Sequence, residues 1–210
     1  MPAKRRYEMR RRAHQVVETR ARIVAAAVEL HREVGPARTT IAEIARRAGV
    51  ERLTVYHHFP DERALFGACQ ARWLAEGPPP NPMRHATIAD PDARLEAVLG
   101  ELYAWYRRGE QVLRNVIRDA ETLPALQETL GAQREAVTQT VELLLKGRRA
   151  RGEHRRRLAA ALALVVDFRT WDTLTSAGLT DAEAANLAAA MIPGPVETRR
   201  KRPARGGLTN

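Results

Sequence analysis

The chain has 210 residues, of which 44 % are apolar, a share that is ordinary for a globular protein and excludes wholesale disorder. A single cysteine excludes an internal disulfide framework, no apolar run approaches the ~20 residues that cross a bilayer, and the arginine-rich start lacks the apolar segment of a secretory signal, so we expect a cytoplasmic protein. The formal net charge is +10, and the excess lies at the two ends, which suggests that only part of the chain meets a polyanion.

The N-terminal part of the chain predicts four helices after a basic arm. Residues 1–15 have no apolar face, so we expect a flexible arm or a frayed helix start. An apolar stripe over 16–34 predicts an amphipathic helix, which ends where Gly and Pro follow. Two short helices are expected at 40–48 and 51–58, and the first opens with a Thr-Ile-Ala-Glu capping box. A fourth is expected over 61–76, with an aspartate as its N-cap.

Four prolines within residues 77–82 must break the fourth helix, so we place a domain boundary there. A basic linker is expected over 146–157, and Thr180 begins a second capping box. Strand-like alternation is missing, so the predicted fold class is all-α. Apolar spacing typical of helices continues to Pro193 in five segments, at 95–106, 112–120, 126–144, 158–175 and 181–191.

Residues 40–58 have the spacing of a helix-turn-helix. Ala45 lets two helices cross closely, Gly49 accepts the positive φ that the turn needs, and Val55 anchors the second helix on the first. The alternative is an ordinary corner between two helices. In the helix-turn-helix interpretation, three residues of the second helix would face the major groove of DNA, namely Arg52, Thr54 and His58.

The same stretch resembles the TetR family of bacterial repressors. It reads TTIAEIARRAGV from Thr39 and TVYHHF from Thr54, against a family pattern of T-[ST]-[VI]-x-x-IA-x-x-AGV followed by a TLYYHF-like recognition helix. The detailed match covers about residues 16–76. The resemblance implies a three-helix helix-turn-helix DNA-binding domain over 16–76 and a larger helical regulatory and dimerisation domain over 77–192, followed by a basic, disordered tail over 193–210.

The resemblance also implies roles for single residues. Arg52, Leu53 and Thr54 are the expected readers of base edges, since arginine can fork onto guanine and leucine can touch a thymine methyl. For Tyr56 the alternative is a ring packed between helices. An acid, Glu62, stands where the family carries a lysine. The expected phosphate contacts are Thr39, Thr40, Tyr56, His57, His58 and, in place of that lysine, Arg63.

The basic ends have two interpretations each. Residues 4–6 and 10–12 of the arm could track phosphates or enter the minor groove, as basic arms do, or form a solvated disordered end. The second basic cluster, Arg199–Arg202, is expected to be disordered.

The second domain is expected to form a homodimer. Residues 158–166 are apolar without a break, and a helix that is apolar all round must be buried all round, half in its own core and half against a second subunit. In TetR-like proteins the last two long helices form such an interface. The alternative is a central core helix of a monomer. The expected interface residues are Leu158, Leu162, Val165, Val166, Ala182, Ala185 and Ala189.

The resemblance further implies a pocket for a small-molecule effector in the second domain, with the helix at 61–76 as the lever that moves the paired DNA-binding heads. Each candidate residue has core packing or a surface ion pair as its alternative. The candidates are the aromatic and polar residues Trp105, Tyr106, Asn115, Arg118, Phe168, Trp171 and Asp172.

Other chemistry is sparse in this sequence. Neither a Gly-rich phosphate loop nor a Ser/His/Asp signature is present, and the adjacent His57 and His58 point to different faces, so we expect no metal, no cofactor and no catalysis. Cys69 is expected to pack as a small apolar residue and not to act as a redox sensor. The sequence therefore predicts a homodimeric repressor that binds a palindromic operator and is released by an effector. The alternatives are a regulator without a small-molecule ligand and an all-α enzyme.

Overall fold

The structure is a computed structural model, which describes the backbone of residues 2–193 and the side chains of residues 7–193. Within that range every regular element is a helix, so the all-α prediction is confirmed. The predictions for the basic tail, Arg199–Arg202 included, and for the side chains of residues 4–6 lie outside this description. None of the described helices combines the length and hydrophobicity that crossing a bilayer requires.

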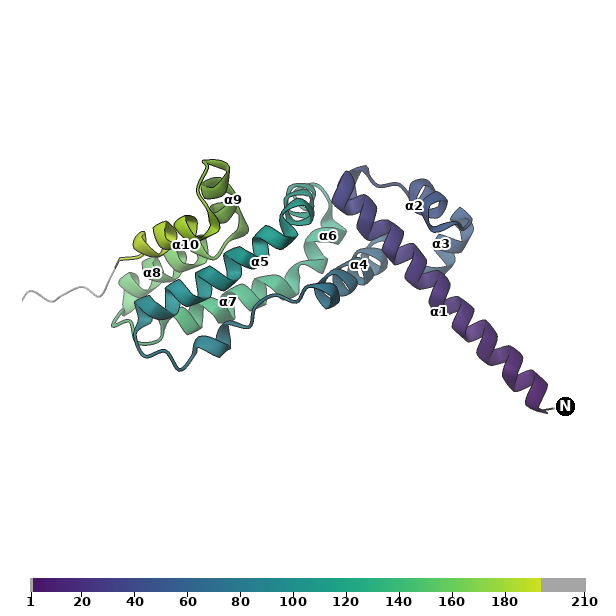
Figure 1. Ribbon diagram of the computed structural model, residues 1–210, viewed down its shortest axis with the longest axis horizontal. Helices are drawn as coiled ribbons and strands as arrows, with labels where there is room; N and C mark the ends of the chain where they lie inside the picture. Colours follow the sequence, from purple (N-terminus) through teal and green to yellow (C-terminus); the bar gives the residue numbers. More distant parts are fainter. Residues whose placement is uncertain (1, 194–210) are drawn as a thin grey trace, which may run out of the picture.

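The helices form an elongated molecule with a smaller N-terminal group, here called the head, and a larger C-terminal group, here called the bundle (Figure 1). The head consists of α1 (Pro2–Glu33), the 3₁₀ turn η1 (Pro36–Arg38), α2 (Ile41–Ala48), α3 (Arg52–His58) and α4 (Glu62–Glu76). The bundle follows with η2 (Pro82–His85), α5 (Pro91–Asp119), α6 (Pro124–Thr129), α7 (Gly131–Leu145), α8 (Gly152–Val165), α9 (Phe168–Ser176) and α10 (Asp181–Ala190).

The head has a buried core of its own, to which all four of its α-helices contribute. Ile23 and Ala27 of α1 carry the predicted stripe into this core, whereas Val16 at the start of the stripe is 55 % exposed. Cys69 of α4 is buried here too, and burial raises the pKa of its thiol to about 12. The thiol therefore stays protonated at neutral pH and packs as a small apolar side chain, as expected.

Helix α1 extends well beyond the head. Of the two states expected for residues 1–15, a flexible arm or a frayed helix start, the described part is helical from Pro2 onward. Five of residues 2–15 are Arg, which favours helix, and neither Gly nor Pro occurs between Pro2 and Gly35. The few apolar side chains of this segment find no packing partner in the head, but that does not lower the helical propensity of the segment.

Helix α5 is the central element of the bundle. It joins the stripes predicted at 95–106 and 112–120 into a single helix of 29 residues. Gly109 lies in the middle, where glycine is ordinarily unfavourable by about 1 kcal/mol. A Cβ at this position would lie 2.8 Å from the Trp73 ring of α4, so the glycine makes room for that ring.

Two predicted helices are each divided in the structure. The stripe over 126–144 is split between α6 and α7, and the helix predicted over 158–175 is split between α8 and α9. The second break occurs because Asp167 caps α9, its carboxylate accepting a hydrogen bond from the amide of Arg169 at 2.7 Å. Helix α8 also starts at Gly152, inside the predicted linker.

The head and the bundle meet where α1 and α5 both end. The side-chain amide of Asn115 donates to the carbonyls of His31 and Arg32, at 3.1 and 2.8 Å. The buried carboxylate of Asp119 accepts from the amide of Ala37 at 2.9 Å. Gly35 has a φ of 95°, and a Cβ there would collide with this carboxylate. These contacts tie the C-terminal end of α1 to the C-terminal end of α5.

Candidate nucleic-acid interface

The scaffold of the helix-turn-helix has the predicted geometry. Gly49 adopts a left-handed conformation with φ 66° and ψ 42°, and its amide donates to the carbonyl of Ala45. Ala45 is buried at the crossing of the two helices, and Val55 is completely buried beneath α3. A short turn and one fully buried anchor therefore fix the direction of the other side chains of α3.

The outward face of α3 presents the predicted base readers to solvent. Arg52 and Leu53 are exposed, Leu53 by 75 %, and Thr54 is half-buried beside them. Tyr56 is 55 % exposed, so its ring is not packed between the helices, and His57 is exposed as well. The side chains of Arg52 and Leu53 are therefore accessible to a partner.

The start of α2 holds the two threonines that are predicted to bind phosphate. The Thr40 hydroxyl accepts a hydrogen bond from the amide of Glu43 at 3.2 Å, which leaves its own proton free to donate. The Glu43 carboxylate binds Arg46 rather than completing the predicted capping box. The Thr39 hydroxyl donates to the carbonyl of Gly35 at 2.8 Å, so it keeps only acceptor capacity. Of the two hydroxyls, that of Thr40 is the better phosphate donor.

The end of α3 lies against α1. The guanidinium of Arg20 stacks over the Phe59 ring at 4.8 Å, directly after the last residue of α3. Partial burial, together with the neighbouring His57 and Arg20, lowers the pKa of His58 below its ordinary value.

Arg63, the expected substitute for the family lysine, points toward the bundle. Its guanidinium forms an ion pair with Glu128 of α6. Binding phosphate would require Arg63 to leave or share this partner, and the neighbouring Glu62 adds a negative charge at the start of α4. A phosphate contact from Arg63 stays a prediction.

Four of the seven candidate effector residues form one aromatic cluster. The ring centroids of Trp105, Tyr106, Phe168 and Trp171 lie 5.2 to 5.9 Å apart in the neighbouring pairs. Their polar atoms bind protein groups: Trp105 donates to the Gly77 carbonyl at 2.9 Å, Tyr106 to the Val166 carbonyl at 2.6 Å and Trp171 to the Asp181 carboxylate at 3.0 Å. The cluster is packed core with its hydrogen bonds satisfied.

The other three candidates lie outside this cluster. Asn115 and Arg118 belong to the junction between head and bundle, where Arg118 donates to the Asp119 carboxylate at 2.7 Å. The Asp172 carboxylate of α9 accepts a hydrogen bond from Arg114 of α5 at 2.6 Å. The structure thus brings the aromatic candidates together and places the polar ones elsewhere.

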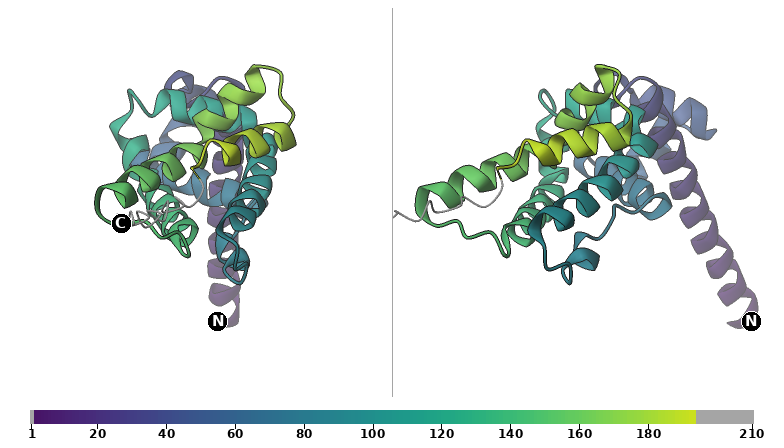
Figure 2. Two further views of the ribbon diagram at one scale, coloured as in Figure 1. Left: turned by 90° about the vertical axis from the view of Figure 1, so that its left-hand side faces the viewer. Right: turned by 60° about the vertical axis from the view of Figure 1, so that its left-hand side comes forward.

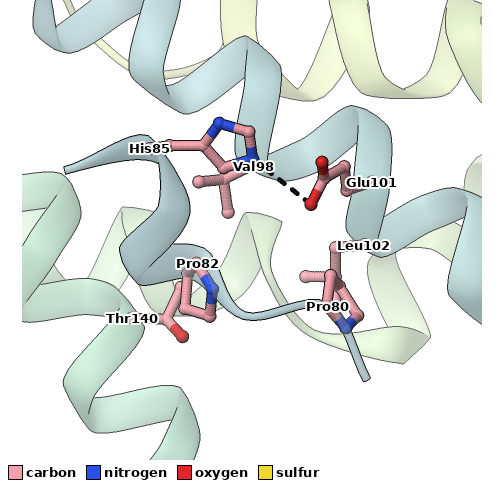
Figure 3. A pocket seen from close by; sticks show the side chains of 7 residues that line it. All are labelled: Pro80, Pro82, His85, Val98, Glu101, Leu102 and Thr140. Atoms are coloured by element: carbon pink, nitrogen blue, oxygen red, sulfur yellow. Dashed lines mark ion pairs between the residues drawn. The ribbon is translucent and has the colours of Figure 1, made fainter. Parts of the chain in front are cut away.

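A small pocket opens between η2, α5 and α7, and none of the seven candidates lines it (Figure 3). Its volume is about 30 Å³, which is room for a water molecule or two. In its wall, Nε2 of His85 lies 3.3 Å from the Oε2 carboxylate oxygen of Glu101. The sequence offers no signal for this pair, since its members are 16 positions apart and belong to no motif. The lining residues are Pro80, Pro82, His85, Val98, Glu101, Leu102 and Thr140.

The residues predicted for the dimer interface mostly face inward. Leu158, Leu162, Val165 and Val166 of the α8 region are buried in the core of the bundle, together with Ala185 of α10. Ala189 is half-buried and Ala182 is exposed. The outward apolar side chains of the same region are different ones: Leu164, 56 % exposed, Leu187, 44 %, and Met191, 53 %.

Among the described side chains, those of residues 7–193, no three His, Cys, Asp or Glu residues are grouped closely enough to hold a metal ion.

Known proteins share both the motif and the fold of this chain. A family model described as "Bacterial regulatory proteins, tetR family" matches residues 23–69. The HTH-type transcriptional regulator Rv2250c of Mycobacterium tuberculosis is 30 % identical over 166 residues, which are 78 % of this chain and 84 % of that protein. This similarity extends well past the helix-turn-helix.

Solved structures show the same arrangement of helices. NalD, the secondary repressor of the MexAB-OprM multidrug efflux pump in Pseudomonas aeruginosa, is 24 % identical with a TM-score of 0.58 over 85 % of this chain and 95 % of that one. AibR, solved with isovaleryl coenzyme A and operator DNA, is 20 % identical with a TM-score of 0.61 over 83 % of this chain and 97 % of that one. The chain therefore belongs to the TetR family of bacterial transcriptional regulators, and its helix-turn-helix is a DNA-binding unit.

Proposed function

We propose that this protein is a homodimeric repressor of the cytoplasm, which binds a palindromic operator and leaves it when a small-molecule effector binds the bundle. Residues 16–76 would form the DNA-binding domain and residues 77–192 the regulatory and dimerisation domain. The observation that carries the proposal is the exposed reading face of α3, Arg52 and Leu53, held on a fully buried Val55. No catalytic role belongs to the proposal.

The homodimer is supported by the outward apolar side chains of α8 and α10. Leu164, Leu187 and Met191 are each about half exposed, and Figure 1 shows α8 and α10 at the end of the molecule away from the head. Large apolar side chains left exposed on the last helices support an interface with another protein surface. A second copy of the same surface gives a two-fold dimer, whose two α3 helices then meet two half-sites of a palindrome.

An effector site in the bundle is supported by the position of the aromatic cluster, which packs against α4 through Trp73 and Trp105, whose ring centroids are 5.1 Å apart. Effector binding that moves these rings would move α4 and with it the head. The packing also favours a second candidate function, a regulator without a small-molecule ligand that is controlled by its abundance or by a protein partner. The satisfied hydrogen bonds and the pocket of about 30 Å³ are the observations behind it.

The DNA-binding assignment is tested by selecting the operator from a randomised duplex library and measuring its affinity by fluorescence polarisation. We expect Arg52→Ala to weaken operator binding about 10- to 100-fold, since a bidentate arginine contributes about 1 to 3 kcal/mol of base discrimination. Arg72→Ala removes the same guanidinium from the exposed surface of α4 and serves as the matched control. Equal operator affinity for Arg52→Ala and wild type would refute the role of α3.

The choice between the two modes of control depends on ligands. Thermal-shift screening of small molecules, followed by operator release in the polarisation assay, identifies an effector if one exists. A compound that raises the melting temperature and releases DNA supports the effector-controlled repressor. Release by a protein partner alone supports the second candidate.

A further inference from the structure

The N-terminal half of α1 is an exposed helix that projects from the molecule. The described side chains from Tyr7 to Glu18 are all exposed, and the first fully buried residue of α1 is Ile23. Figures 1 and 2 show this half of α1 leaving the head on the side away from α8 and α10. An isolated helix of this length is marginal in water by itself, so a partner surface would stabilise it.

Most of the net positive charge of the head lies on this projecting segment. Residues 1–22 carry 8 Lys and Arg against 2 Asp and Glu, whereas residues 23–63, which contain the helix-turn-helix, carry 6 of each. Four of the six basic residues in 23–63 are also paired with acids: Arg32 with Glu29, Arg46 with Glu43, Arg47 with Glu33 and Arg63 with Glu128. A DNA-binding unit that is neutral overall leaves the phosphate charge to be met by another segment, because phosphate neutralisation supplies much of the affinity for DNA.

The projecting segment starts beside the recognition helix. Arg20 of α1 stacks on Phe59, the residue that follows α3, so α1 passes the C-terminal end of α3 as it leaves the head. Residues 2–19 span about 27 Å at 1.5 Å per residue. At 3.4 Å per base pair this length corresponds to about 8 base pairs.

We propose that residues 2–19 form a second DNA-binding element, a basic helix that lies against the backbone of the duplex next to the half-site read by α3. The proposal depends on DNA binding by α3 and extends the footprint of each head beyond it. Arg10, Arg11 and Arg12 are exposed on consecutive positions, so they face different directions around the helix and can meet phosphates on both sides of it. The apolar residues Met9 and Val16 share a face that would rest on the sugars.

A second copy of the same helix is the competing occupant of this apolar face. Met9, Ala13 and Val16 follow the spacing of a helix–helix contact, which would pair two α1 segments. Residues 2–19 carry 6 Lys and Arg against 2 Asp and Glu, a net charge of +4, so two copies side by side repel one another, whereas a duplex attracts both. The charge therefore favours DNA.

The test compares wild type with the triple variant Arg10→Gln/Arg11→Gln/Arg12→Gln on two duplexes. One duplex is the selected operator trimmed to the half-sites, and the other keeps about 10 flanking base pairs on each side. We expect wild type to bind the flanked duplex more tightly and the variant to lose this difference, with affinity for the flanked duplex reduced about tenfold or more at about 0.1 M salt. The slope of log affinity against log salt should become shallower by about 0.9 for each phosphate that the variant no longer neutralises.

Controls separate this inference from the function on which it rests. Glutamine keeps helical propensity, which circular dichroism checks, and Arg84→Gln/Arg149→Gln/Arg151→Gln removes the same charge from exposed positions of the bundle. An unchanged salt slope in the α1 variant, or equal loss on both duplexes, would overturn the proposal. A change in molecular mass by light scattering, with DNA binding intact, would identify a second copy as the occupant and overturn it too. Arg52→Ala tests α3 on the trimmed duplex and is independent of α1.

Discussion

At the scale of single residues, the junction between head and bundle contains two ionisable side chains, His31 and Asp119, that are buried. His31 is 6 % exposed and packs on Phe66 of α4, with ring centroids 5.7 Å apart. Burial lowers the pKa of His31 to about 4, against a smaller opposing effect of the Asp119 carboxylate. Burial alone would raise the pKa of Asp119, but hydrogen bonds from Arg118 and from the amide of Ala37 hold it below its ordinary value.

The buried His31 predicts a loss of stability in mild acid. The folded state holds the imidazole neutral while the unfolded chain takes up a proton below pH 6.5, so the free energy of unfolding falls as pH drops from 6.5 to about 4. Between pH 7.5 and 5.0 we expect a loss of about 2 kcal/mol from this residue, measured by urea unfolding. In His31→Phe this part of the pH dependence should disappear, whereas His154→Phe, at an exposed position of α8, should retain it. A His31→Phe protein with the pH dependence of wild type would contradict the assignment.

At the scale of elements, local signals located the helix ends better than apolar stripes located the helices. Both predicted capping threonines, Thr40 and Thr180, begin helices, and Thr180 forms the complete box with Glu183. By contrast, the uninterrupted apolar run 158–166 suggested one helix through to 175, although the chain breaks at Asp167. A hydrophobic pattern reports which residues are buried, not whether the backbone between them bends.

The break at Asp167 has a measurable energetic consequence. Asp167→Ala removes the side chain that caps α9, and we expect the free energy of unfolding to fall by about 1 kcal/mol. Asp167→Asn keeps an oxygen that can accept from the Arg169 amide and should restore most of the loss. Urea denaturation of the three proteins at neutral pH measures both effects. Equal stability of the alanine variant and wild type would show that the cap does not hold the break.

At the scale of the whole molecule, the sequence identified the head and its motif but not how the bundle is used. Ala45, Gly49 and Val55 were predictable because a helix-turn-helix is a local structure with a fixed spacing. The surroundings of Trp105 and Asn115 were not, since their partners Gly77 and His31 are 28 and 84 positions away. Contacts over such distances in sequence leave no periodic pattern, so burial of an aromatic or polar residue could not be assigned to a pocket, a core or a junction.

The same limit applied to the dimer, because an apolar helix shows no inner and outer side until its neighbours are known. Leu162 faces the core of the bundle and Leu164 faces outward, although both lie in one apolar run. The exposed residues, not the buried ones, are therefore the ones on which assembly of the proposed dimer would depend.

This arrangement predicts that assembly is lost when charge enters the outward face of α10. Leu187 of α10 and Met191, the residue that caps the end of α10, lie four positions apart and are both exposed, so Leu187→Glu/Met191→Glu would place four carboxylates at a two-fold interface. Light scattering at micromolar concentration should give the mass of a dimer for wild type and of a monomer for this variant. Val137→Glu introduces the same kind of charge at an exposed apolar position of α7 and should leave the mass unchanged. Since each head then reads its half-site alone, the variant should also bind the palindromic operator far more weakly than wild type. A monomeric wild-type protein would contradict the proposed dimer and, with it, the need for a palindrome.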